Sequence, residues 1–197
     1  MPLLRTVQQA KDLVISAKFP PQGQRGFGSP FAPSRFDPAP TMTEYLQQAN
    51  DSLLTMVQIE TREALDVVED IAAVPGIDVL FIGPFDLGTR APCYDAACPC
   101  RRSNNALSGN NIGHPILNGV MDPELDAAIA KILAAARGAG KKCGIFCGDG
   151  VQSKMYADQG FDMISAGTDV ITLAEAMGAS ISIAKGGRDT LAKSKGY

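Results

Sequence analysis

The hydrophobic positions of the chain follow two spacings, one typical of amphipathic helices and one typical of buried strands. In residues 6–17 the apolar side chains of Val7, Ala10, Leu13 and Val14 fall on one helical face. Short continuous apolar runs, such as IDVLFIG, indicate strands instead. The pattern predicts helices at 6–17, 42–50, 61–73, 123–139, 151–158 and 169–185, and strands at 53–59, 77–83, 143–147 and 161–167.

Residues at the ends of these segments support the predicted boundaries. Pro20 and Pro21 cannot continue the first helix, and VPG at 74–76 ends the third. Pro123 suits the first turn of a helix, and Asp122 suits the N-cap position before it.

Strands that are apolar throughout and alternate with helices are typical of a parallel sheet buried on both faces, so the fold class is α/β. A complete (β/α)8 barrel needs about 250 residues, whereas this chain has 197. We therefore expect a partial TIM (β/α)8 barrel that lacks roughly the first strands. Residues 1–197 would form a single incomplete barrel domain.

Two segments interrupt the alternation of strands and helices. Residues 20–41 form a Gly/Pro-rich loop that is longer than ordinary connections. Residues 89–109 show no periodicity, and their removal joins Gly88 to Asn110 in a smooth continuation. The segment 89–109 is therefore interpreted as an irregular insertion, either a true surface insertion or a translated, retained intron.

The composition is that of an ordinary globular protein. Eighteen Lys and Arg residues stand against 21 Asp and Glu, which gives a formal net charge of −3, and 45% of residues are hydrophobic. No apolar run approaches the ~18 residues of a membrane span, and no basic stripe is present. We expect neither a membrane nor a nucleic acid as a partner.

The five cysteines do not suggest a disulfide framework, because their number is odd and no export signal is present. A cytoplasmic location is therefore expected. Cys143 and Cys147 flank an apolar strand and should be buried free thiols. A zinc site formed by Cys93, Cys98 and Cys100 is the least favoured interpretation of the insertion, because paired Cys-x-x-Cys spacing is missing.

Two acidic side chains follow neighbouring strands, at the edge where parallel sheets and barrels build their sites. Glu60 comes directly after the strand at 53–59, and Asp86 follows the strand at 77–83 after the turn Pro84-Phe85. Two carboxylates that meet there would suit Mg²⁺ or Mn²⁺. Acidic residues also favour helix N-termini, and the spacing alone favours that simpler role.

Several motifs are similar to those of one enzyme family. They are PPQGQRGFG at 20–28, EYLQQAN at 44–50, VQIET at 57–61, VPGIDVLFIGPFDL at 74–87, GIF at 144–146 and SAGTDV at 165–170. Over nearly all of the chain except 89–109, the sequence resembles the HpcH/HpaI aldolase family. These are class II, metal-dependent pyruvate aldolases of the phosphoenolpyruvate/pyruvate barrel superfamily. The resemblance implies a carbon-carbon lyase that cleaves a 4-hydroxy-2-oxo acid to pyruvate and an aldehyde.

The resemblance also implies roles for individual residues. Glu60 and Asp86 match the two protein ligands of a divalent metal, Mg²⁺ or Mn²⁺, with Co²⁺ as a further option. Gln58 matches a side chain that contacts the pyruvate moiety. Phe85 matches a position whose backbone N–H helps to hold the substrate carboxylate, next to Asp86. The implied partner is a small 2-oxo acid, and a complete version of the protein would be a homo-oligomer.

No catalytic residue is assigned within residues 1–197. In the family, the base histidine and an arginine that stabilises the developing charge come from the first strands of the barrel, which would precede Met1. His114 does not align with that base and should be a solvated loop histidine. Arg25 matches a family arginine of the long loop and should order that loop or meet a neighbouring subunit.

Two other functions stay open. The chain is alternatively a non-catalytic fragment, a metal- or oxo-acid-binding remnant that lacks the catalytic base. It is otherwise a citrate-lyase-like lyase acting on a CoA ester, for which the loop at 20–41 offers only Arg25 and Arg35. An incomplete barrel exposes hydrophobic edges, so the polypeptide alone should be poorly soluble or need a partner chain.

Overall fold

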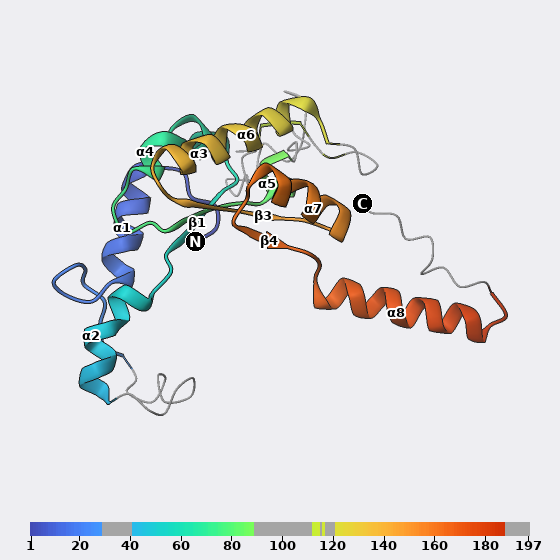
Figure 1. The fold of residues 1–197 in the computed structure, drawn as a ribbon, viewed down its shortest axis with the longest axis horizontal. Coiled ribbons are helices and arrows are strands. Elements are labelled where there is room, and N and C mark those ends of the chain that lie inside the picture. Colours follow the sequence, from blue (N-terminus) through green and yellow to red (C-terminus); the bar gives the residue numbers. More distant parts are fainter. Residues whose placement is uncertain (29–40, 89–111, 115, 117–120, 188–197) are drawn as a thin grey trace, which may run out of the picture.

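The computed structural model describes residues 1–28, 41–88, 112–114, 116 and 121–187, and shows a parallel sheet with helices between its strands (Figure 1). Each described strand pairs in parallel with the next, so the spatial order β1-β2-β3-β4 is also the sequence order. The carboxyl ends of these strands therefore lie at one edge of the sheet. The strands are β1 (Met56–Ile59), β2 (Val79–Ile82), β3 (Lys142–Phe146) and β4 (Met163–Ser165).

Helices cover one face of this sheet, drawn uppermost in Figure 1. They are α3 (Arg62–Asp66), α4 (Val68–Ala72), α5 (Pro84–Gly88), α6 (Pro123–Gly138) and α7 (Gly150–Gln159). The strand side chains that form the core with this layer have no exposed surface, and burial of apolar area is the main force that holds the two layers together. These side chains are Val57, Ile59, Leu80, Ile82, Cys143 and Ile145.

The opposite face of the sheet is less covered. Gln58, Phe81 and Phe146 alternate with the core residues along their strands and are only half-buried. The predicted burial of the sheet on both faces therefore holds for one face only, within the described residues.

The start of α6 was correctly predicted from local signals. A side-chain oxygen of Asp122 accepts a hydrogen bond from the Glu124 amide at 2.9 Å, and Pro123 occupies the first helical position. The apolar side of the helix, which includes Leu125, Ile129 and Ile132, is buried against α4 and the strands beneath it.

The amino-terminal residues lie along the free edge of β1. The nitrogen of Met1 donates to the Met56 carbonyl at 2.7 Å, and the amide of Gln58 donates to the Met1 carbonyl at 2.8 Å. This alternation is the hydrogen-bond pattern of a parallel ladder. The chain then enters α1 (Val7–Ala17), which opens with a capping box between Thr6 and Gln9.

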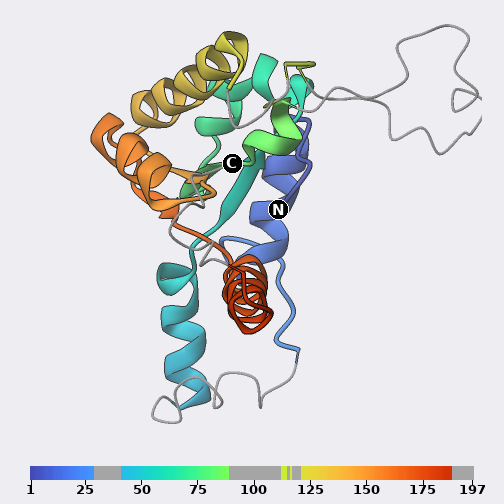
Figure 2. The ribbon, with the colours of Figure 1, turned by 90° about the vertical axis from the view of Figure 1, so that its right-hand side faces the viewer.

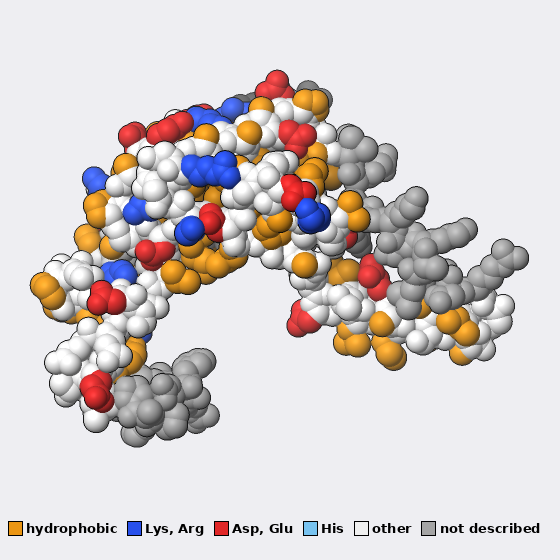
Figure 3. Space-filling model, viewed as in Figure 1, with side chains coloured by type: hydrophobic (Ala, Val, Ile, Leu, Met, Phe, Trp, Pro, Cys, Tyr) orange, Lys and Arg blue, Asp and Glu red, His pale blue; other side chains and the backbone are white. Residues whose placement is uncertain are grey.

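Two helices extend away from the layered body. α2 (Met42–Ser52) and α8 (Asp169–Ala184) leave it on the side opposite the helical layer, as Figures 1 and 2 show. α8 has strongly exposed apolar side chains, among them Leu173 at 65% and Met177 at 55%. Figure 3 shows hydrophobic side chains along this helix. In the described part of the chain, no helix has both the length and the apolar character that crossing a membrane requires.

Several predicted segments differ in detail from the structure, and the strands expected at 53–59 and 77–83 shorten to β1 and β2. The single helix expected at 61–73 is divided into α3 and α4 at Val67, whose backbone (φ −119°, ψ 26°) is not helical. The expected turn Pro84-Phe85 is the start of the short helix α5. Strand 161–167 contracts to β4. The predictions for 89–109, for Arg35 and for Cys93, Cys98 and Cys100 lie outside the described residues.

Candidate active site

Glu60 lies directly after β1, where the sheet ends. Its side chain is almost fully buried, with 2% of its surface exposed, and the following residue Thr61 has none. The hydroxyl of Thr61 accepts a hydrogen bond from the Ala64 amide at 3.2 Å and so caps α3. The cap is therefore Thr61, and the simpler interpretation of Glu60 as a helix cap is not what the structure shows.

Asp86 lies in the first turn of α5, which follows β2 after Gly83. The helix is anchored by Leu87, which is fully buried and whose amide donates to the Gly83 carbonyl at 2.9 Å. This anchor leaves Asp86 itself exposed at the carboxyl edge of the sheet.

The two carboxylates converge on Gly83. A Cβ atom added at this glycine would lie 2.7 Å from Glu60 Oε2 and 3.7 Å from Asp86 Oδ2. It would also lie 3.7 Å from Gln58 Nε2. The absence of a side chain at Gly83 therefore lets the Glu60 carboxylate lie against its backbone, with the polar ends of Asp86 and Gln58 close by.

Hydrogen bonds fix both oxygens of the Glu60 carboxylate. Oε1 accepts from the backbone amide of Leu3 at 2.6 Å, and Oε2 accepts from Gln58 Nε2 at 3.1 Å. Burial raises the pKa of Glu60 most strongly; the hydrogen bond from Leu3 opposes this increase, and the negative charge of Asp86 adds to it. A cation bound between the two carboxylates would relieve both the burial cost and the repulsion.

The donor set fits a small divalent cation. Carboxylate oxygens are the hard ligands that Mg²⁺ and Mn²⁺ prefer, and both ions commonly take their other ligands from water and substrate. Among the residues that the structure describes, no group of three or more His, Cys, Asp and Glu side chains is arranged to hold a metal. The candidate site is thus a pair of carboxylates beside Gly83, and a cation held there would take its other ligands from water and substrate.

Aromatic side chains stand beside this site. Phe85, next to Asp86 on α5, is 48% exposed, and its ring meets that of Phe146 at the end of β3 edge-to-face, with centroids 6.3 Å apart. The structure thus brings Gln58, Glu60 and Asp86 together, with Phe85 adjacent to Asp86.

The other two residues considered from the sequence have structural partners. The side chain of His114 is 39% exposed, and its Nδ1 lies 3.2 Å from Oδ1 of Asp122, the N-cap residue of α6. Arg25 stacks over the ring of Phe19 at 4.7 Å and reaches the Tyr45 hydroxyl at 3.4 Å. These contacts tie the described part of the loop to Phe19 and to α2, which suits a residue that orders the loop. The alternative role of Arg25 at a neighbouring subunit stays a prediction.

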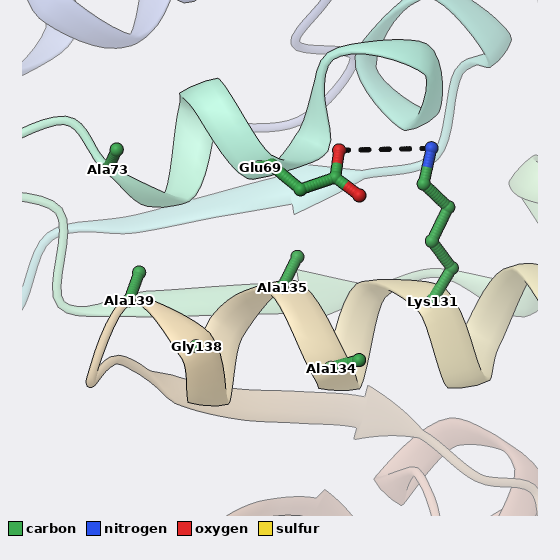
Figure 4. Close-up of a pocket in the computed structure, with 7 residues that line it drawn as sticks. All are labelled: Glu69, Ala73, Lys131, Ala134, Ala135, Gly138 and Ala139. Atoms are coloured by element: carbon green, nitrogen blue, oxygen red, sulfur yellow. Dashed lines mark ion pairs between the residues drawn. The ribbon is translucent and has the colours of Figure 1, made fainter.

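A groove between α4 and α6 lies in the helical layer, and neither candidate metal ligand lines it (Figure 4). The figure shows small side chains along α6, with Lys131 reaching across to Glu69 at 3.8 Å. Lys131 also donates to the Leu65 carbonyl at 2.9 Å. The polar groups of this groove are therefore engaged in holding the two helices together.

Two parts of the site were missed by sequence reasoning. Leu3 acts through its backbone amide, and a backbone donor has no sequence signature. Gly83 was noted only as the end of a strand. The signal that could have identified Gly83 is its position between a strand and Pro84-Phe85-Asp86. A glycine at the end of a strand often marks a place where another part of the protein or a ligand comes close to the backbone.

Comparisons with a family model and with curated relatives point to the same family of aldolases. Residues 1–96 match the model of the family described as HpcH/HpaI aldolase/citrate lyase. The chain is 34% identical over 186 residues to a hydroxypyruvate/pyruvate aldolase of Chromohalobacter salexigens, covering 94% of this chain and 63% of the relative. It is 33% identical over 189 residues to a 4-hydroxy-2-oxo-heptane-1,7-dioate aldolase of Salmonella newport, covering 94% of this chain and 62% of that protein.

Solved structures agree with the sequence relatives. An HpcH/HpaI aldolase/citrate lyase family protein from Burkholderia cenocepacia superposes with a TM-score of 0.69 at 30% identity, over 94% of this chain and 63% of the other. An HpcH/HpaI aldolase from Desulfitobacterium hafniense gives a TM-score of 0.71 at 26% identity, over 94% and 62%. The chain thus spans less than two thirds of the length of these relatives, and the predicted fold class, a partial α/β barrel, is confirmed.

Proposed function

Because the chain belongs to the HpcH/HpaI aldolase/citrate lyase family, we propose that it carries the metal-binding part of a class II pyruvate aldolase site. The reaction is the retro-aldol cleavage of a 4-hydroxy-2-oxo acid to pyruvate and an aldehyde. The observation that carries this proposal is the convergence of the Glu60 and Asp86 carboxylates at Gly83.

Each residue has a distinct task in this proposal. Glu60 and Asp86 hold the divalent cation, Mg²⁺ or Mn²⁺, with Co²⁺ as a further candidate. When bound, the cation supplies the positive charge that stabilises the negative charge developing on the 2-oxo acid as its C3–C4 bond breaks. Gln58 donates to Glu60 through Nε2 and is close enough to Gly83 to orient the pyruvate moiety. The backbone N–H of Phe85 contributes to holding the substrate carboxylate.

The proton transfers of the reaction need a base that we do not assign to a described residue. His114, whose Nδ1 is engaged with Asp122, is not proposed for this role. We propose instead that the base histidine and its companion arginine come from the part of the family barrel that residues 1–197 do not span.

Manganese binding tests the metal site directly. Binding during a Mn²⁺ titration is monitored by the loss of the free-ion signal in electron paramagnetic resonance. We expect this titration to show one site in the wild-type chain. Glu60→Gln or Asp86→Asn should weaken binding by more than the 10–100-fold typical of losing an outer-shell partner. Glu63→Gln and Asp70→Asn, which change exposed carboxylates on α3 and α4, serve as matched controls and should bind as the wild type does.

An assay of pyruvate release distinguishes the aldolase from the non-catalytic remnant and from the citrate-lyase-like enzyme. It is made on the protein that includes residues 1–197. The substrate to try first is 4-hydroxy-2-oxo-heptane-1,7-dioate, the compound in the name of the Salmonella relative. Metal-dependent pyruvate release that is lost in Glu60→Gln supports the proposal. Tight Mn²⁺ binding without pyruvate release would favour the non-catalytic remnant, and cleavage of a CoA ester alone would favour the citrate-lyase-like reaction.

The proposed setting is the cytoplasm. Cys143 and Cys147 are fully buried free thiols, as the sequence predicted, and a reducing compartment suits them. Burial raises the pKa of the Cys143 thiol to about 12, so it stays protonated and unreactive.

A further inference from the structure

The amino-terminal segment, residues 1–4, meets Glu60 at a point where a regular strand pairing is interrupted. Along β1 the segment follows a parallel ladder. Met1 forms hydrogen bonds with Met56 and Gln58, the two neighbours of Val57, which lies opposite Met1. In a continued ladder, the next amide, that of Leu3, would donate to the carbonyl of Gln58. It donates instead to Glu60 Oε1 at 2.6 Å.

An unusual backbone conformation turns the Leu3 amide toward the carboxylate. Leu3 is the one non-glycine residue with a positive φ in the described chain, at 52°. The left-handed region is unfavourable for a residue with a Cβ, and such residues gather where the surrounding structure imposes them at functional sites. Its side chain is 52% exposed, so packing of the leucine does not explain the conformation.

The residues around Leu3 hold this conformation in place. Leu4 has no exposed surface, and its carbonyl accepts a hydrogen bond from the Thr61 hydroxyl at 2.8 Å. Thr61 is itself the N-cap of α3. The segment is therefore hydrogen-bonded to β1 through Met1 and to the start of α3 through Leu4. These two attachments lie before and after Glu60 in the sequence.

We infer that Leu3 is a positioning residue for the metal ligand Glu60, acting through its backbone amide. The bond to Leu3 occupies Oε1 and directs Oε2 toward Gly83, which Asp86 also approaches. The inference rests on the proposed function, because it assigns Leu3 the task of preparing one cation ligand. Outer-shell partners of this kind orient ligands before the metal arrives.

Replacing a single backbone amide by an ester tests this role. Incorporation of the α-hydroxy analogue of leucine at position 3 removes the N–H and keeps the side chain. We expect Mn²⁺ affinity to fall by about 10–100-fold, with an unchanged far-ultraviolet circular dichroism spectrum. Leu3→Ala is the matched control, because it keeps the amide and changes only the exposed side chain, and it should bind Mn²⁺ as the wild type does. Equal Mn²⁺ affinity in the ester variant and the wild type would overturn the inference.

A second measurement separates this inference from the proposed function. In the metal-free protein, the ¹⁵N–¹H signal of the Leu3 amide should move upfield in Glu60→Ala, because a hydrogen bond to a carboxylate is lost. Glu63→Ala should leave this signal in place. If the signal moves but the wild type binds no Mn²⁺, the contact between Leu3 and Glu60 stands and the metal site fails. If the signal does not move, Leu3 does not position Glu60.

Discussion

At the scale of single residues, Gly83 decides whether the two carboxylates can serve one ion. A methyl group at this position would stand 2.7 Å from Glu60 Oε2, closer than a Cβ atom tolerates. We expect Gly83→Ala to displace the Glu60 side chain, to lower stability by about 1–3 kcal/mol, and to abolish Mn²⁺ binding in the titration described above.

A second glycine provides the control for Gly83→Ala. Gly138, at the end of α6, has no atom near the position of an added Cβ. Gly138→Ala should therefore raise stability by up to about 1 kcal/mol, as expected for alanine in a helix, and leave Mn²⁺ binding intact. Normal Mn²⁺ affinity in Gly83→Ala would show that Mn²⁺ binding does not depend on the absence of a side chain at Gly83.

Asp162 gives the protein a predictable sensitivity to acid. Its carboxylate accepts hydrogen bonds from Lys142 Nζ at 2.8 Å and from the Cys143 amide at 3.0 Å, which together hold the pKa of Asp162 below its ordinary value of 3.8. Because the folded pKa is the lower one, the stabilisation is complete above the unfolded pKa and is lost as the pH falls through the folded pKa.

Asp162→Asn should lower the free energy of unfolding at pH 7 by about 1 kcal/mol, a value reduced for the partial exposure of the pair. The difference from the wild type should shrink below pH 4, which urea unfolding curves at several pH values would measure. Asp158→Asn, which breaks the exposed i,i+4 pair with Lys154, is the control and should change stability little. If the difference in free energy of unfolding between the wild type and Asp162→Asn grew as the pH fell, the lowered pKa of Asp162 in the folded protein would be wrong.

At the scale of elements, Lys131 compensates for the interruption between α3 and α4. A continuous helix would pair the Leu65 carbonyl with the amide of residue 69. Since the helix breaks at Val67, Lys131 Nζ donates to that carbonyl from α6 at 2.9 Å. We expect Lys131→Met to lower stability by about 1–2 kcal/mol in thermal or urea unfolding, because the carbonyl loses its partner.

The ion pair of Lys131 with Glu69 provides the matched comparison. The Glu69 side chain is 61% exposed and lies 3.8 Å from Lys131 Nζ. Glu69→Gln should therefore change stability by less than about 1 kcal/mol. An effect of Glu69→Gln as large as that of Lys131→Met would show that the ion pair, and not the Leu65 carbonyl, is the stabilising contact.

These elements also show how far the sequence alone could lead. α6 was predictable because Asp122, Pro123 and its apolar stripe are all local signals. The ends of parallel strands placed Glu60 and Asp86 at one edge, but their choice as metal ligands came from the family resemblance, since spacing alone favoured helix caps. The break at Val67 was not predictable, because Lys131, which donates to the Leu65 carbonyl beside the break, is distant in sequence. α5 was missed because five residues are too few to show helical periodicity.

At the scale of the whole molecule, the described residues on either side of 89–111 meet after α5. The Ile112 amide donates to the Leu87 carbonyl at 3.0 Å, and Arg62 Nη2 donates to the Ile112 carbonyl at 2.9 Å. The described residues on both sides of 89–111 are thus fastened independently of what lies between. This supports the interpretation of 89–109 as an insertion, which remains a prediction.

Deletion of residues 89–109 should leave the fold and Mn²⁺ binding unchanged. The closed loop becomes much shorter, so the loss of loop-closure entropy falls and stability should rise by about 1–2 kcal/mol. Replacement of 89–109 by a Gly/Ser segment of equal length is the control, which should match the wild type in stability. A deletion variant that no longer binds Mn²⁺ would show that the segment contributes to the site.

The exposed surface of α8 leads to a prediction about assembly. Val170, Leu173, Met177 and Ile181 recur at the spacing of one helical stripe, and each is between 50% and 73% exposed. Apolar stripes of this kind are rarely left in water by a stable monomer and usually mark an interface. We therefore predict that the protein self-associates and that α8 of one copy is covered by another.

Sedimentation equilibrium of the wild type and of Leu173→Glu with Met177→Glu would test this assembly. The wild type should sediment as a multiple of 20.7 kDa, and the double variant should shift toward the monomer. Val151→Glu, at an 82% exposed apolar position on α7, is the control and should leave the mass unchanged. If the wild type is a monomer with a sharp thermal transition, the exposed α8 side chains are tolerated in water and the homo-oligomer is wrong. If instead the mass falls alike in the double variant and in Val151→Glu, association is non-specific and does not depend on α8.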